Sequence, residues 1–164
     1  MRTEIFKRQE NLARLFAQAY KLESSDEIGL EVKAGFVSFL CLRTYAEFEI
    51  SIIDILRDYV RQTQNDKHVA HFVDSQLQNR RRNLKHYELL GLVASFSEDW
   101  KTDVRASTHG ELRDSLDSLV SQRNKIAHGE ATYISLKDLK KYFDDINRII
   151  ILVEEKCIEL SGQD

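Results

Sequence analysis

The sequence has no proline and only six glycines in 164 residues. These two residue types most often end or kink a helix, so their scarcity predicts few interruptions and long helices. No segment has the run of apolar residues that a membrane span requires, and the charged N-terminus is unlike a signal peptide. We therefore expect a cytoplasmic protein.

Cysteine is scarce as well, and no charge of one sign dominates. Cys41 and Cys157 each lie within an apolar helical pattern, which predicts two buried free thiols and a reducing compartment. The formal net charge of −3 excludes a generally basic nucleic-acid binder, so any contact with RNA must be local. The five histidines are scattered without the spacing of metal ligands, and no glycine-rich phosphate loop is present. We expect neither a metal nor a cofactor.

What the sequence does contain is apolar residues at helical spacing over most of its length. This period predicts helices over residues 3–22, 26–64, 68–81, 85–96, 109–128 and 135–160. The polar segment 97–107 is predicted to be a loop, and no strand-like alternation or internal repeat occurs. The predicted fold is all-α, an up-and-down bundle of about five to six helices. We expect one domain over residues 1–164.

Local signals place several helix ends. Gly129 is well placed to end the fifth predicted helix. Three pairs of residues have the spacing of a capping box and predict helix starts: Ser24 with Glu27, Thr108 with Glu111, and Ser135 with Asp138.

The most distinctive segment is Arg-Asn-Lys-Ile-Ala-His at residues 123–128. Arg123 falls in the apolar stripe of its helix, where a charge must be paired or must line a cleft. Alternatively, its stem packs at the edge of the core while its guanidinium reaches water. The apolar stripe alone leaves both interpretations open.

His128 follows in the last turn of the same helix, where the helix dipole favours the protonated imidazole. Five residues separate Arg123 from His128, so the two do not share a face of a regular helix. Asn124 does share a face with His128 and could orient its ring. Alternatively, the histidine is a C-terminal cap and nothing more.

Two glutamates of the second predicted helix are expected to differ. Glu47 lies on the polar face and is predicted to be solvated, whereas Glu49 shares a stripe with apolar residues. An acid in such a position usually pairs with a base. Arg123 is the natural partner, and Arg113 and Arg148 remain alternatives.

The main basic cluster consists of Arg80, Arg81, Arg82 and Lys85, with His86 next to it. Such a cluster could guide an RNA backbone towards a cleft. It could equally be a solvated turn between two helices.

Taken together, these features resemble the HEPN superfamily, most closely its stand-alone prokaryotic members from toxin–antitoxin, restriction and other defence loci. The resemblance covers residues 30–160. It rests on Tyr-Ala-Glu-Phe-Glu at residues 45–49, on Arg-Asn-x-x-x-His followed by Gly129, and on the long final helix.

The resemblance implies a helical bundle that forms a two-fold dimer, with an arginine–histidine motif from each protomer facing a shared cleft. Many members are metal-independent endoribonucleases, and others are silent modules that bind a nucleotide or a partner protein. Carried onto this chain, the site residues are Arg123, Asn124 and His128, with Glu49 as the acidic residue. RNA and an antitoxin or other defence-system protein are the implied partners. In some relatives a modified tyrosine follows the histidine by two residues, where this chain has Glu130. A plain helical dimerisation protein is the remaining alternative.

Overall fold

The computed structural model describes residues 2–79, 83–130 and 134–159, and helices account for most of these residues. Within these residues there are seven α-helices and no strand: α1 (Arg2–Glu23), α2 (Leu30–Thr63), α3 (Lys67–Asn79), α4 (His86–Ala94), α5 (Glu98–Ser107), α6 (Glu111–Ala127) and α7 (Leu136–Glu159). The predicted all-α class is confirmed.

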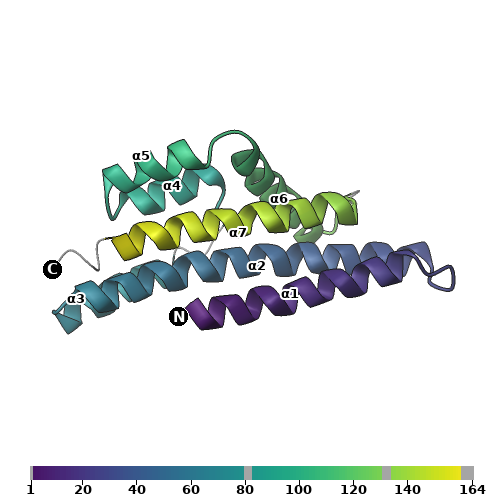
Figure 1. The fold of residues 1–164 in the computed structure, drawn as a ribbon, viewed down its shortest axis with the longest axis horizontal. Helices are drawn as coiled ribbons and strands as arrows, with labels where there is room; N and C mark the ends of the chain where they lie inside the picture. The colour runs from purple at the N-terminus through teal and green to yellow at the C-terminus, as the bar shows by residue number, and fades with distance from the viewer. Residues whose placement is uncertain (1, 80–82, 131–133, 160–164) are drawn as a thin grey trace.

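The 34-residue helix α2 is the centre of the arrangement, because it contacts α1, α3, α6 and α7. α2 and α7 lie side by side and run in the same direction, and α1 runs antiparallel along α2 (Figure 1). The short helices α4 and α5 pack together on the other side of α7, and α6 leads from them back towards α2. The C-terminal end of α6 is thereby brought against the middle of the bundle.

One continuous core joins these helices. It takes apolar residues from every helix, including Phe16, Leu77, Leu116 and Ile149, and its centre is a run of fully buried residues of α2. Cys41 and Cys157 are both buried thiols outside any disulfide, as predicted, and burial raises the pKa of each to about 12. A thiol with so high a pKa is not a nucleophile at neutral pH.

The segment 97–107 was predicted to be a loop, and this prediction is wrong, since α5 occupies it. The described residues therefore contain seven helices instead of the expected five to six. Only Trp100 and Val104 are buried in α5, one helical turn apart, so its apolar period is too short to detect. The start signal was nevertheless present, because the Ser97 side chain accepts a hydrogen bond from the backbone N–H of Trp100.

Two of the three predicted capping boxes are also wrong. α2 begins after Gly29, and the Ser24 hydroxyl instead donates to backbone carbonyls at the end of α1. α6 begins after Gly110, which has a φ of 66°, while the Thr108 hydroxyl donates to the Val104 carbonyl. A hydroxyl at the end of one helix can bond backwards as well as forwards, and here it does so.

The third capping pair is confirmed. The Asp138 backbone N–H donates to the Ser135 hydroxyl oxygen at 3.0 Å, and the Ser135 hydroxyl donates to the Asp138 carboxylate at 2.7 Å. These bonds precede and begin α7, so the long final helix starts where the sequence indicated.

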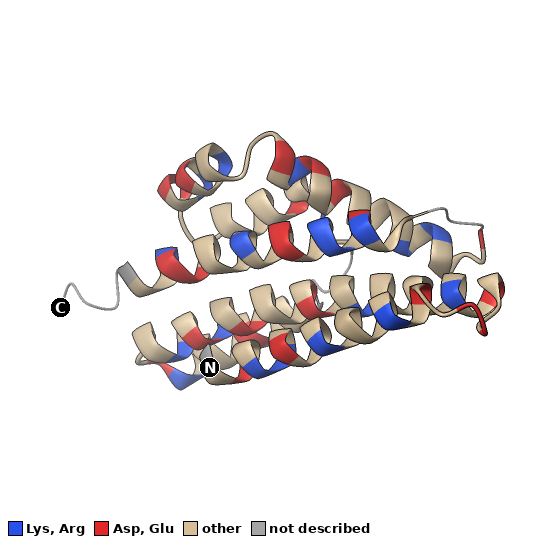
Figure 2. Cartoon of the chain, turned by 45° about the vertical axis from the view of Figure 1, so that its right-hand side comes forward, with Lys and Arg blue, Asp and Glu red and all other residues tan. Residues whose placement is uncertain are grey.

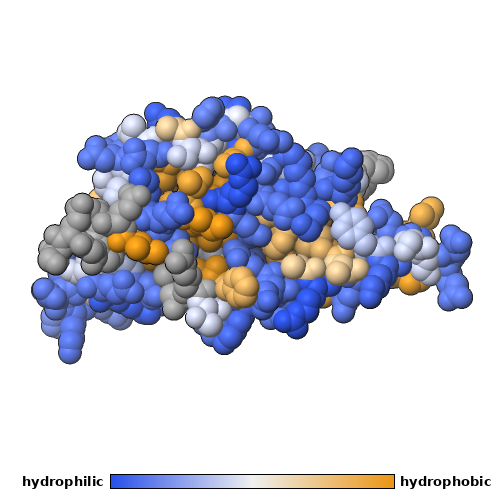
Figure 3. Space-filling view, in the orientation of Figure 1, coloured by the Kyte–Doolittle hydropathy of each residue, from blue (hydrophilic) through white to orange (hydrophobic). Residues whose placement is uncertain are grey.

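The surface has mixed charge. Acidic and basic residues alternate along the helices (Figure 2), in agreement with the net charge of −3. The face in Figure 3 is mainly hydrophilic, with hydrophobic side chains exposed in a band across its middle. Among the residues that the structure describes, no helix is long and apolar enough to cross a membrane.

Candidate functional site

The C-terminal end of α6 carries Arg123, Asn124 and His128. His128 is the last residue before the chain turns, and Gly129 follows with a φ of 74°, a left-handed conformation that glycine adopts without strain. The backbone N–H of Gly129 donates to the Ile126 carbonyl, and that of Glu130 donates to the Lys125 carbonyl. These two bonds form a Schellman motif. The predicted end of the helix at Gly129 is confirmed, and the motif holds His128 in a defined position.

Arg123 is half-buried and points from α6 towards α2. Its guanidinium lies over the ring of Tyr45, with Cζ 5.3 Å from the ring centroid. Nη1 donates hydrogen bonds to the side-chain oxygens of Asn124 at 2.9 Å and of Asn83 at 3.4 Å. All three of these partners are uncharged.

Tyr45 is the point where the elements of the site meet. The side chain is buried, with 2% of its surface exposed. Its hydroxyl donates to Glu49 Oε1 at 3.1 Å and accepts from the backbone N–H of Leu84 at 2.7 Å. Burial raises the pKa of the Tyr45 hydroxyl far above its ordinary value, the Leu84 N–H lowers it, and Glu49 raises it further. The hydroxyl thus stays protonated and remains a donor to Glu49.

The partner of Glu49 differs from the one expected. Within the described residues, neither Glu49 nor Arg123 forms an ion pair, and the hydrogen bond that Glu49 accepts comes from Tyr45. The expected direct pair between Glu49 and Arg123 is replaced by contacts of both residues with one tyrosine. In this part of the chain, the Arg123 charge is therefore left without a neutralising carboxylate.

Asn124 and His128 are likewise not joined through their side chains. The Asn124 side-chain oxygen accepts from Arg123, and the link to His128 is a backbone bond from the His128 N–H to the Asn124 carbonyl at 3.0 Å. The imidazole is exposed and makes no hydrogen bond with any residue that the structure describes. Asn124 thus orients the arginine, and the histidine ring is open to a ligand.

Glu47 was predicted to be solvated, and this prediction is wrong. It is 6% exposed and accepts hydrogen bonds from Arg8 Nε at 2.7 Å and from the Ser51 hydroxyl at 3.1 Å. Arg8 also donates to Asp54 at 3.1 Å. α1 covers the polar face of α2, and the spacing of apolar residues along α2 does not reveal this contact.

The basic cluster is only partly visible. Arg80, Arg81 and Arg82 lie outside the described residues. Lys85 is exposed and occupies the N-cap position of α4 without a side-chain capping hydrogen bond. His86 is buried, with Nε2 2.7 Å from the Thr108 hydroxyl oxygen, and burial lowers its pKa although Asp117 raises it. His86 thus belongs to the interior, whereas Lys85 follows the two residues, Asn83 and Leu84, that touch the site.

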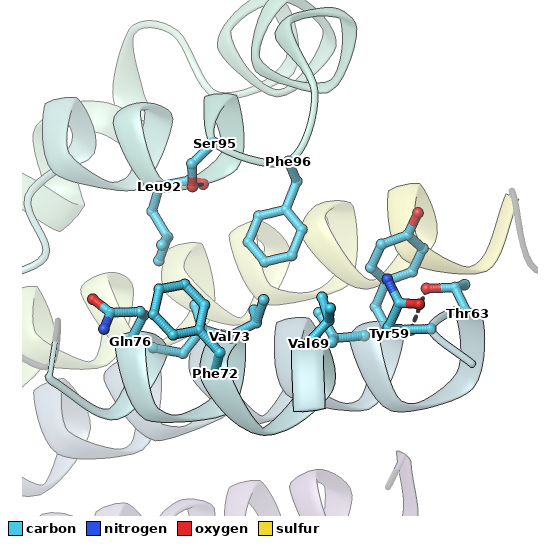
Figure 4. A pocket seen from close by; sticks show the side chains of 12 residues that line it. Tyr59, Thr63, Val69, Phe72, Val73, Gln76, Leu92, Ser95 and Phe96 are labelled. Carbon is cyan, nitrogen blue, oxygen red and sulfur yellow. Dashed lines mark hydrogen bonds between the residues drawn. The ribbon is translucent and has the colours of Figure 1, made fainter. Parts of the chain in front are cut away.

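A hollow of about 530 Å³ lies elsewhere, between the end of α2, α3 and the turn after α4. Phe72 and Phe96 face each other across it (Figure 4), and the side chains that line it are uncharged. It contains none of the predicted site residues. The C-terminal end of α6 is the better candidate site, because a cation (Arg123) and a proton-transfer group (His128) lie there and the hollow contains neither.

Two residues of the site were missed by the sequence analysis. Tyr45 entered the sequence analysis only as part of the segment 45–49 and was given no role, although a buried tyrosine usually needs a partner for its hydroxyl. Asn83 has a φ of 50°, a conformation that asparagine tolerates better than most residues, but its position beside Arg123 has no local signal. Finally, no group of three or more possible metal ligands occurs within the parts of the chain that the structure describes.

Comparison with known proteins supports the resemblance noted in the sequence. Neither the curated proteins nor the solved structures include a significant match to this chain. A family model described as RiboL-PSP-HEPN matches residues 3–159, which is nearly the whole chain. The protein therefore belongs to the RiboL-PSP-HEPN family of the HEPN superfamily.

Proposed function

We propose that this protein is a metal-independent endoribonuclease that acts through Arg123 and His128, with the whole chain serving as one helical domain. The observation that carries the proposal is the state of Arg123. It is half-buried, held by three uncharged partners, and without a carboxylate within the described residues. A guanidinium held in this way is ready to bind a phosphate oxygen.

The chemistry needs no metal. The 2′-hydroxyl of RNA attacks the adjacent phosphorus, a bond from phosphorus to the 2′-oxygen forms, and the bond to the 5′-oxygen breaks. A base takes the proton of the 2′-hydroxyl, and an acid gives a proton to the leaving 5′-oxygen. A histidine such as His128 can serve as the base or as the acid, and each such proton transfer typically raises the reaction rate by about 10²–10⁴-fold. Arg123 stabilises the charge on the phosphate oxygens.

A second copy of the chain supplies the other proton-transfer group. Phe39 and Leu42 are 44% and 37% exposed and lie one turn apart on α2, and Leu42 shares a face with Glu49 about two turns further along the helix. Exposed apolar side chains beside a polar site favour contact with another protein surface. A two-fold dimer through this face would bring two His128 residues to one cleft, one as base and one as acid.

The remaining predicted residues have supporting roles. Asn124 fixes the guanidinium of Arg123, and Glu49 acts through Tyr45 without touching the RNA. Lys85, together with Arg80, Arg81 and Arg82, attracts the RNA backbone to the neighbourhood of Asn83. A toxin or defence role, with an antitoxin as the regulating partner, is what the family resemblance adds.

The test is cleavage of a panel of single-stranded RNAs in the presence of EDTA, with the products analysed at their ends. We expect cleavage that leaves a 2′,3′-cyclic phosphate and that stops when the 2′-hydroxyl at the cleaved bond is replaced by hydrogen. His128→Ala and Arg123→Ala should each lower the cleavage rate by about 10²-fold or more while the circular dichroism spectrum is unchanged. Binding of RNA without cleavage by the wild-type protein would instead indicate a silent binding module, and full activity of both variants would end the proposal.

A further inference from the structure

Tyr45 connects three parts of the chain that are far apart in sequence. Its ring supports Arg123 of α6, its hydroxyl holds Glu49 one turn along α2, and the same hydroxyl accepts from Leu84 before α4. Asn83, next to Leu84, reaches the same guanidinium. A hydroxyl in this place uses both its donor and its acceptor capacity, so its removal changes more than packing.

The hydrogen bond to Glu49 matters because Glu49 and Arg123 carry opposite charges next to one ring. Both act electrostatically on the Tyr45 hydroxyl, Glu49 raising its pKa and Arg123 lowering it. Yet the two do not form an ion pair, since the Glu49 carboxylate is bonded to the tyrosine and Arg123 to the amide oxygens. A free glutamate beside an arginine would be expected to pair with it.

We propose that Tyr45 is a positioning residue that keeps Arg123 available to a phosphate by holding Glu49 away from it. This inference rests on the proposed role of Arg123 in binding RNA phosphate. The Tyr45 ring holds the Arg123 guanidinium in place through a cation–π contact. The Tyr45 hydroxyl holds the Glu49 carboxylate, which would otherwise compete with the RNA phosphate for Arg123.

Tyr45→Phe separates the two parts of this role. The ring that supports Arg123 stays, and the hydroxyl that holds Glu49 is removed. Glu49 then turns to Arg123 and competes with the phosphate, so RNA binding weakens. In Tyr45→Phe/Glu49→Gln the neutral amide cannot compete as an anion, and binding returns. A purely structural hydroxyl predicts no such return, because the second change repairs no packing.

The experiment measures binding of a 2′-O-methyl RNA oligonucleotide, which cannot be cleaved through its 2′-oxygen, by fluorescence anisotropy. We expect Tyr45→Phe to raise Kd about threefold to tenfold, the size of one competing ion pair at a half-buried position. The double variant should lie within about twofold of the Kd of wild type, the usual scatter of additivity. Glu49→Gln alone completes the cycle. Melting temperatures of all four proteins are recorded alongside.

Ser115→Ala is the matched control for reduced stability. Ser115 is a buried hydroxyl of the same helix α6, it donates to Asp145 at 2.6 Å, and it lies two turns from Arg123. Its removal should lower the melting temperature as Tyr45→Phe does, without a change in Kd.

Each outcome bears on one proposal or the other. A Kd in the double variant as high as in Tyr45→Phe would overturn the role of Tyr45, while cleavage by wild type would keep the endoribonuclease proposal intact. If wild type binds the oligonucleotide but never cleaves RNA, the proposed activity fails and the Tyr45 role is still decided by the Kd values. If wild type does not bind RNA at all, both proposals are wrong.

Discussion

Two arginines that both face α2 have opposite surroundings. Arg8 of α1 donates to Glu47 and Asp54, so its charge is compensated by two carboxylates, one of them buried. Arg123 of α6 rests on an aromatic ring and donates to two amide oxygens. The first arrangement joins two helices, and the second leaves a positive charge that a ligand can neutralise. The partners of an arginine therefore indicate its role better than its burial does.

The largest expected effect separates the two arginines by activity. Arg123→Ala should lower RNA cleavage by about 10²–10³-fold, the usual cost of removing a donor to a developing oxyanion. The free energy of unfolding should change little, because no ion pair is broken. Cleavage rates under EDTA and a thermal melt measure the two effects, and Arg8→Ala serves as the control with near-normal cleavage per folded molecule. A large drop in stability in Arg123→Ala would break the comparison.

The second effect is on stability and belongs to Arg8. Arg8→Ala leaves Glu47 buried beside Ser51 without its cation, which should cost about 2 kcal/mol of unfolding free energy. Glu47→Gln in the same chain should recover part of this cost, since an amide is less expensive to bury than a lone carboxylate. Urea unfolding of the three proteins gives the values. No recovery in the double variant would mean that the arginine stem, and not its charge, stabilises the contact.

A third experiment tests whether the basic cluster of residues 80–82 and 85 also binds RNA phosphates. Charge reversal at Lys85, or at Arg80, Arg81 and Arg82 together, should weaken RNA binding and lower the slope of log Kd against log salt concentration. The slope should fall by about one for each phosphate that the variant no longer binds. The cleavage rate at saturating RNA should remain. An unchanged salt slope would restrict the phosphate contacts to Arg123.

The smallest expected effect concerns His86, a basic group that is buried yet can lose its charge. Burial lowers its pKa below the ordinary 6.5, so the unfolded chain binds the proton more readily than the folded one. The contribution of neutral, buried His86 to the free energy of unfolding is complete above about pH 6.5 and declines as the pH falls below that value. Unfolding measured across pH 5–8 should therefore have a shallower pH dependence in His86→Gln than in wild type. An equal slope in both proteins would contradict this expectation.

The sequence predicted most of the fold because the relevant signals are local. The apolar period placed the long helices to within a few residues, except for the start of α2, and Gly129 ended α6 as expected. The period failed for α5, where two buried residues one turn apart are too few to define a stripe. It also misled at Ser24 and Thr108, where a side-chain hydroxyl had a choice between two helices.

The sequence predicted some residues of the candidate site, but it did not predict their contacts. Arg123 and His128 stood out as polar residues at the end of a patterned helix, and Glu49 as an acid in an apolar stripe. Which residue Glu49 bonds, and that Asn124 serves the arginine, depend on how α2, α6 and residues 83–84 come together. Glu47 and Glu49 lie on the same helix, yet Glu47 pairs with Arg8 while Glu49 accepts a hydrogen bond from Tyr45.

The sequence by itself determined that this protein is helical, where most of its helices run, and that an arginine and a histidine close α6. These properties follow from spacing along one chain, which the 3.6-residue turn converts into faces. Only the tertiary structure decided that α1 covers Glu47 and that Tyr45 contacts both Glu49 and Arg123. The physical reason is that the partner of a charge is chosen by distance in space, and residues 39 positions apart in sequence, as Arg8 and Glu47 or Tyr45 and Leu84 are, become neighbours only through packing.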